Sequence, residues 1–193
     1  MTRRISVLLM AGGFAVASLS VVTLARAAEV FTLTSSVIQD NGTLASKNAC
    51  SDKEKTPNCV GENISPPLAW SNPPAATKSF ALVLIDPEGR APTGFTHMVL
   101  YGIPADTKGF AEGELSKPSE KFVGGKNSIG LATYFGPGTP PNTDWHHYTW
   151  TIIATDLDPK ALQPGMTREE LAAALKDHVK GSAGLVTRFR HPT

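Results

Sequence analysis

Four stretches of this chain have the composition of β-strands: residues 30–34, 79–86, 95–103 and 148–157, separated by segments rich in proline and glycine. Residues 80–85 are apolar without a break, as expected of a strand buried on both faces. Residues 148–154 mix aromatic, β-branched and polar positions, which is typical of a half-buried strand. A further β-run is predicted near the C-terminus, at residues 185–190.

One α-helix is also predicted. Thr167 and Glu170 have the spacing of a capping box, apolar residues recur at helical spacing from Leu171 to Val179, and Gly181 suits the C-terminal cap. Residues 106–126 are polar and punctuated by glycine, which predicts a long surface loop. Together these elements predict a mainly β fold: an antiparallel, Greek-key-like β-sandwich with a peripheral C-terminal helix.

Residues 1–27 have the features of a signal peptide. Arg3 and Arg4 precede an uncharged run at residues 5–24, and Ala25-Arg26-Ala27 offers a cleavage site. An uncleaved membrane anchor is the alternative, although glycine, serine and threonine dilute the hydrophobicity of the run. We therefore expect residues 28–193 to form one periplasmic or secreted domain, with no stable membrane span after cleavage.

The two cysteines, Cys50 and Cys59, lie in a polar, turn-rich loop. In an oxidising compartment they are expected to form a disulfide. A free buried thiol or half of a metal site are the alternatives, but a metal site would need further soft ligands nearby.

The formal net charge of +1 argues against a nucleic-acid partner. A small molecule or another protein is the expected partner instead.

Two segments carry candidate binding chemistry. The first is the glycine and proline loop at residues 136–141, which is followed by His146-His147-Tyr148; the second runs from Asp86 to His97. Glycine lets a ligand approach the backbone, while proline makes the loop rigid. Imidazole and phenol groups would add hydrogen-bond donors, so the two segments predict one anion pocket.

These residues resemble the phosphatidylethanolamine-binding protein (PEBP) family, in its bacterial Raf-kinase-inhibitor-like (YbhB/YbcL-type) branch. The resemblance covers about residues 31–190 and implies a compact β-rich fold, a pocket for phosphate-like or phospholipid head groups, and in many members an inhibitory role through protein partners. Its motifs occur in the family order: Asn63-Ile64-Ser65-Pro66-Pro67-Leu68-Ala69-Trp70, Asp86-Pro87-Glu88, His97, Tyr134-Phe135-Gly136-Pro137, Pro140-Pro141 and His146-His147-Tyr148.

The resemblance also implies roles for individual residues. As imidazolium groups, His97 and His146 would donate hydrogen bonds to an anion, and Tyr148 would donate its hydroxyl. The Gly136 backbone would approach the phosphate, with Pro141 beside it. Asp86 would orient a histidine or accept a hydrogen bond from a ligand ammonium group. His147 should point to the other face of its strand.

Three alternatives remain at this point. The protein could be an inhibitor or signalling protein that acts on a kinase, protease or host protein through its surface. Two histidines and a carboxylate could also bind a metal, or a Ser-His-Asp hydrolase could be present, although no G-x-S-x-G motif occurs. We expect a non-enzymatic binding protein with no cofactor and no resident metal.

The sequence departs from the family pattern in both loops. Gly89 and Arg90 lengthen the loop after Glu88 and add a cation, and Thr139 adds one residue before Pro140. The shape of the pocket is therefore expected to differ from the family pattern at these positions.

Overall fold

The structure is a computed structural model that describes residues 29–54 and 56–192. The predicted signal peptide, residues 1–27, lies outside the described residues. The strands are β1 Thr32–Thr34, β2 Gly42–Thr43, β3 Leu68–Ser71, β4 Ser79–Asp86, β5 Phe95–Pro104, β6 Gly109–Phe110, β7 Val123–Gly124, β8 His146–Thr155 and β9 Val179–Phe189. The α-helix is α1, Arg168–Ala174, and short 3-10 helices lie at Ser46–Asn48 and Glu114–Ser116.

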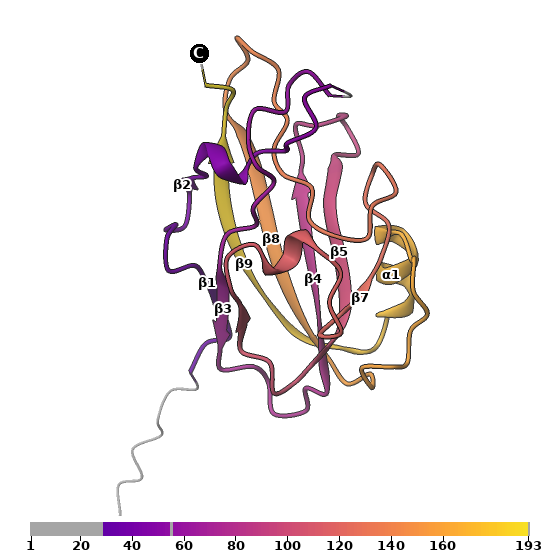
Figure 1. Cartoon of the computed structure of the whole chain (residues 1–193). Coiled ribbons are helices and arrows are strands. Elements are labelled where there is room, and N and C mark those ends of the chain that lie inside the picture. Colours follow the sequence, from indigo (N-terminus) through magenta and orange to yellow (C-terminus); the bar gives the residue numbers. More distant parts are fainter. Residues whose placement is uncertain (1–28, 55, 193) are drawn as a thin grey trace, which may run out of the picture.

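Two sheets form the fold (Figure 1). Within the described residues, the larger sheet has the strand order β2-β9-β8-β4-β5-β7 and the smaller has the order β1-β3-β6. Neighbouring strands are antiparallel except for β2 and β9, which are parallel. The predicted β-sandwich with a peripheral helix is confirmed, and both sheets are open.

The main core lies between the sheets, and β4 shows how the sequence produces it. Phe80, Leu82 and Leu84 point from β4 into this core, where Phe80 packs edge-on against Trp70 of β3. The alternate residues of β4 point the other way, toward a second apolar cluster that includes Leu171 of α1. The unbroken apolar run of β4 is therefore buried on both faces, as predicted.

Two of the predicted elements differ in the structure: the extent of the helix and the character of residues 106–126. The helix ends at Ala174, and Val179 and Gly181 belong to β9, because the chain turns at Asp177 with φ 67° and then pairs along the whole of β8. The segment at residues 106–126 is also more than a surface loop. Phe110, Leu115 and Phe122 from this segment are buried in the main core, which the polar average of the segment concealed.

The predicted disulfide between Cys50 and Cys59 is present, and both cysteines are buried. The Cys50 N–H donates to the carbonyl of Pro137 at 2.9 Å. A Cβ atom built on Gly138 would lie 3.0 Å from the Cys50 sulfur. The disulfide thus holds the 50–59 loop against the glycine and proline loop.

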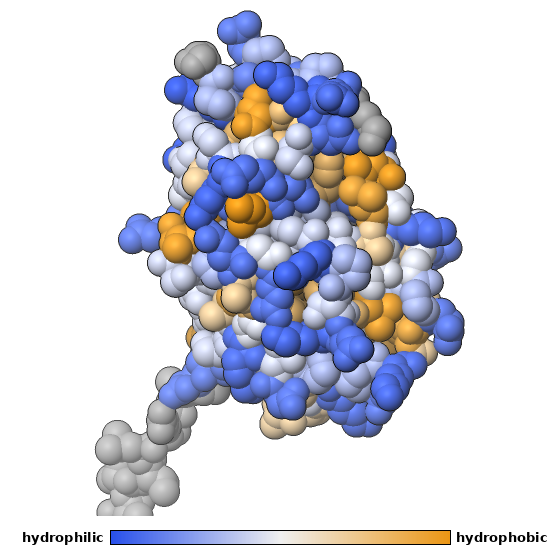
Figure 2. Space-filling model, in the orientation of Figure 1, coloured by the Kyte–Doolittle hydropathy of each residue, from blue (hydrophilic) through white to orange (hydrophobic). Residues whose placement is uncertain are grey.

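The surface is mostly hydrophilic on the face shown in Figure 2, where hydrophobic patches interrupt it. Ile129 and Leu131 are two of the large apolar residues that are exposed. No helix in the described part of the chain combines the length and the apolar character needed to cross a membrane.

Removing the disulfide should destabilise the fold. A Cys50→Ala/Cys59→Ala variant is expected to lose about 2 kcal/mol of unfolding free energy, because the bond constrains a short loop of the unfolded chain. Chemical denaturation of the wild type and the variant, both without reductant, measures this loss. Equal stabilities, or two thiols that alkylate freely in unreduced wild-type protein, would contradict the prediction.

Candidate functional site

A pocket of about 480 Å³ lies at the end of the large sheet where β4 ends and β5 and β8 begin. Figure 1 shows this end of the sheet near the C-terminus of the chain. Its volume is in the range of small-molecule sites. Its lining combines aromatic, aliphatic and charged groups: Thr56, Asp86, Glu88, Gly89, Arg90, Phe95, His97, Ile129, Phe135, Gly138, Thr139, Pro140, Thr143 and His146.

Asp86 joins the two segments that the sequence predicted to meet. Its Oδ1 accepts hydrogen bonds from the N–H groups of Glu88 and Gly89, both at 2.9 Å, which turns the chain at the end of β4. Its Oδ2 lies 2.7 Å from His146 Nδ1 at the start of β8. Burial raises the pKa of the Asp86 carboxyl, and the hydrogen bond and charge of His146 only partly offset this effect.

The contact with Asp86 sets the role of His146. A carboxylate accepts, so Nδ1 carries the proton. Nε2 is then the nitrogen that can meet a ligand, as an acceptor in the neutral ring and as a donor in the charged ring. The side chain is 18% exposed, which is enough for contact with the pocket.

His97 is not the imidazolium donor that was predicted. Its ring is buried against Phe95, Phe135 and Tyr148, at centroid distances of 4.6, 6.1 and 5.2 Å. Burial lowers the pKa of His97 to about 4, against the opposing hydrogen bond to the Phe135 carbonyl. That bond, 2.6 Å long, places the proton on Nδ1, so at neutral pH the ring can only accept through Nε2.

The fixed charges of the lining have both signs. Burial acts to raise the pKa of Glu88, but hydrogen bonds from the N–H and imidazole of His147 outweigh it and lower the pKa to about 2. Arg90 is the cation, and its guanidinium lies 4.8 Å from the centroid of the Phe95 ring. The pocket therefore presents carboxylates and a guanidinium side by side.

Of the six predicted site residues, Asp86, His97 and His146 line the pocket, whereas Gly136, Pro141 and Tyr148 lie outside its lining. The Gly136 N–H donates to Asn63 Oδ1 at 2.8 Å, and a Cβ on Gly136 would lie 2.1 Å from the Asn48 carbonyl oxygen. The absence of a side chain at Gly136 allows the 136–141 loop to pack against the backbone at Asn48. Gly136 is therefore not available for contact with a ligand in the pocket. Pro141 is exposed and outside the lining, where Pro140 takes its place.

Two buried hydroxyls at this end of the sheet have no hydrogen-bond partner among the described residues: those of Thr139 and Tyr148. Thr139 is 2% exposed and lines the pocket. Tyr148 is fully buried against His97 but is not part of the lining. Burial raises the pKa of Tyr148, and the nearby Asp86 charge adds to the rise, so the hydroxyl stays protonated.

His147 behaves as strand alternation predicts. It lies outside the lining of the pocket, and its ring pairs with Glu88 at 2.8 Å. Its effect on the pocket is therefore indirect, through the position of that carboxylate.

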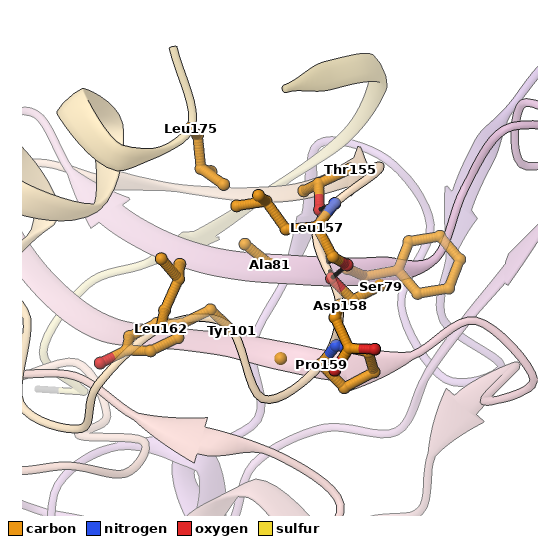
Figure 3. A pocket seen from close by; sticks show the side chains of 11 residues that line it. Ser79, Ala81, Tyr101, Thr155, Leu157, Asp158, Pro159, Leu162 and Leu175 are labelled. Atoms are coloured by element: carbon orange, nitrogen blue, oxygen red, sulfur yellow. Dashed lines mark hydrogen bonds between the residues drawn. The ribbon is translucent and has the colours of Figure 1, made fainter. Parts of the chain in front are cut away.

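A second hollow, at the opposite end of β4, is unsuited to binding (Figure 3). It has a volume of about 10 Å³, room for one water molecule at most. Ser79 Oγ lies 3.1 Å from Thr155 Oγ1 and donates to the Leu157 carbonyl at 2.8 Å. The hydroxyls there are satisfied within the protein, unlike that of Thr139.

The residues that could hold a metal ion are Asp86, Glu88 and His146, whose candidate ligand atoms lie within 4.8 Å of one another. His97 is not in this set, so the facial triad considered from the sequence does not form. Both Asp86 oxygens and His146 Nδ1 are already hydrogen-bonded. A metal ion bound through these atoms would have to displace these hydrogen bonds. The arrangement of Asp86 and His146 therefore fits a hydrogen-bonded carboxylate–imidazole pair better than a metal site.

Several lining residues were not predicted as site residues. Arg90 and Thr139 stood out in the sequence only as departures from the family pattern. Phe95 and Phe135 flank motif residues, but their role as the apolar walls depends on how two distant loops fold together.

Comparisons with known proteins agree with this fold. A family model described as phosphatidylethanolamine-binding protein matches residues 34–190. The chain is 35% identical over 150 residues to a UPF0098 protein of Methanothermobacter thermautotrophicus, covering 74% of this chain and 95% of that protein. It is 32% identical to the UPF0098 protein YbhB of Escherichia coli, covering 67% and 83%. The crystal structure of YbcL from E. coli, described as a member of the mammalian PEBP family, matches with a TM-score of 0.74 and 25% identity over 83% of this chain and 98% of that chain.

The burial of His97 predicts a pH-dependent stability. Its pKa is about 4 in the folded protein, against 6.5 for an unperturbed histidine, so the unfolded chain binds more protons between these values. The stability that neutral His97 contributes is therefore lost as the pH falls through this window. From about pH 7.5 to about pH 5, the wild type should lose about 2 kcal/mol more unfolding free energy than a His97→Gln variant.

Urea denaturation of both proteins at the two pH values tests this. Parallel losses in the two proteins would show that His97 is protonated in the folded state, which contradicts the assignment.

Proposed function

The chain belongs to the phosphatidylethanolamine-binding protein family, and we propose that it is an exported, non-enzymatic binding protein whose pocket holds a small phosphate-bearing head group. The observation that carries the proposal is the Asp86–His146 pair on the wall of an open pocket that also presents a guanidinium and a buried, unpartnered hydroxyl. These are groups that recognise a polar ligand, and the aromatic walls accept its apolar part.

The charges favour a zwitterionic head group over a simple anion. Asp86 and Glu88 would repel phosphate if it lay next to them, but they would attract an ammonium group. Arg90 is suited to bind the phosphate, because guanidinium forms paired hydrogen bonds with phosphate oxygens. A phosphorylethanolamine-type ligand carries both charges a short distance apart.

The composition of the lining supports a binding role without catalysis. His146 held by Asp86 resembles the base and orienting acid of a hydrolase. However, none of the described residues that line the pocket is a serine or cysteine that this pair could activate. The hydroxyl groups of the lining belong to threonines, and that of Thr143 already donates to the Pro140 carbonyl at 2.7 Å.

Export is supported by the predicted signal peptide together with the buried disulfide. Disulfides persist mainly in oxidising compartments such as the bacterial periplasm. A periplasmic or secreted location is therefore part of the proposal.

Titration calorimetry with phosphorylethanolamine tests the proposed ligand. His146→Ala should weaken binding by about tenfold or more, because it removes a hydrogen bond to a charged group and releases Asp86 from its partner. His178→Ala is the matched control. His178 also pairs with an aspartate, Asp156, at 2.7 Å, but Asp156 follows the opposite end of β8.

A second probe, dihexanoyl phosphatidylethanolamine, separates a lipid source of the head group from a soluble one. Tighter binding of the lipid than of phosphorylethanolamine would identify the lipid as the source. If neither probe binds the wild type, or if His178→Ala is as damaging as His146→Ala, the proposed pocket function is wrong and a role in protein interactions takes its place.

A further inference from the structure

We infer that the two loop residues outside the family pattern, Arg90 and Thr139, contact the ligand directly and determine which ligands this pocket accepts. The inference rests on the proposed function, since it concerns the same pocket. Neither residue belongs to the motifs by which the chain resembles its family, so each is a feature of this chain.

Arg90 supplies the fixed positive charge of the described lining. His97, the imidazole at the aromatic wall, is neutral because it is buried, and Asp86 and Glu88 are acidic. Among the described residues that line the pocket, Arg90 is the sole lysine or arginine. An anionic group in the pocket therefore has one fixed cation to bind.

The loop holds Arg90 in place at the mouth of the pocket. Its guanidinium stacks on Phe95, and Nη1 donates to the Ser128 carbonyl at 3.2 Å. A Cβ on the preceding Gly89 would lie 2.8 Å from Phe95 Cβ and 3.0 Å from Asp86 Oδ2. Only glycine lets the lengthened loop pack this closely, and the packing brings the next residue over the aromatic ring.

The remaining donors of Arg90 are available. No carboxylate of the described residues forms an ion pair with it, whereas Arg168 nearby is paired with Glu169 at 2.7 Å. A guanidinium has five N–H donors, and the hydrogen bond to Ser128 uses one of them. A phosphate in the pocket can take two of the others.

Thr139 gives independent evidence for a ligand contact. Its hydroxyl is buried and has no partner among the described residues, although most buried hydroxyls are hydrogen-bonded. Leaving such a group unpaired destabilises a protein. Thr139 lines the pocket, so a ligand that reaches its hydroxyl through a small shift of the loop would supply the missing partner.

The two residues lead to different expectations. Arg90→Gln should weaken phosphorylethanolamine binding by about tenfold and reduce its dependence on salt, because a charge-assisted contact is lost. Arg168→Gln is the control. Arg168 and Arg90 both line a separate hollow of about 230 Å³, but Arg168 does not line this pocket. The control variant should leave the affinity within about twofold of the wild type.

Thr139→Val should weaken binding by about fivefold while the urea midpoint stays equal or rises, because the change removes an unpaired buried hydroxyl. The contrast is Thr187→Val. Thr187 is also buried, but its hydroxyl accepts from Trp150 Nε1 at 3.0 Å. That variant should lower the midpoint and leave the affinity unchanged, so the pair separates ligand contact from a structural role.

Calorimetry and urea denaturation of these four variants decide the inference. It is overturned if Arg90→Gln binds like the wild type, or if Thr139→Val loses stability without losing affinity. Either outcome would rule out the roles of Arg90 and Thr139. The proposed pocket function would still stand in that case, provided that the wild type binds phosphorylethanolamine and His146→Ala does not. Failure of the wild type to bind removes both.

Discussion

The architecture of the pocket depends on the hydrogen bonds of one buried carboxylate. Asp86 uses one oxygen to accept two backbone N–H groups of its own loop and the other to bind His146. The first set turns the chain after β4, and the second ties that turn to β8. An unpaired carboxylate buried at this depth would be costly, so the loop, the strand end and the imidazole must form together. The pocket is a consequence of that arrangement at the rim of the sheet.

Burial then divides the two histidines into different roles. His97 lies among aromatic rings that exclude water, which keeps it neutral and leaves it only an acceptor. His146 is partly exposed and keeps a nitrogen toward the ligand space. The fixed positive charge of the lining comes from Arg90, and Asp86 and Glu88 of the same loop supply its carboxyl groups. The presence of both signs of charge in a partly apolar pocket favours a ligand that carries both signs.

Local patterns predicted the features that depend on local physics. The apolar run of β4 and the capping box of α1 are both present, and the order of motifs identified Asp86, His97 and His146. Other features depend on residues far away in sequence. Gly136 is committed to Asn63 and to the chain at Asn48, the helix stops early because β9 pairs along all of β8, and the neutrality of His97 follows from Phe95 and Phe135. Arg90 and Thr139 line the pocket through loop lengthening, which no motif encodes.

The most direct test of this account is long-range ¹H–¹⁵N NMR of the imidazole nitrogens, recorded from about pH 5.5 to about pH 8 with and without phosphorylethanolamine. The account predicts that His97 remains neutral with its proton on Nδ1 across the range, and that the ligand shifts the Nε2 resonance of His146. A His97 ring that becomes charged near its ordinary pKa, or a His146 ring that does not respond to a ligand that binds, would contradict the assignment of the pocket.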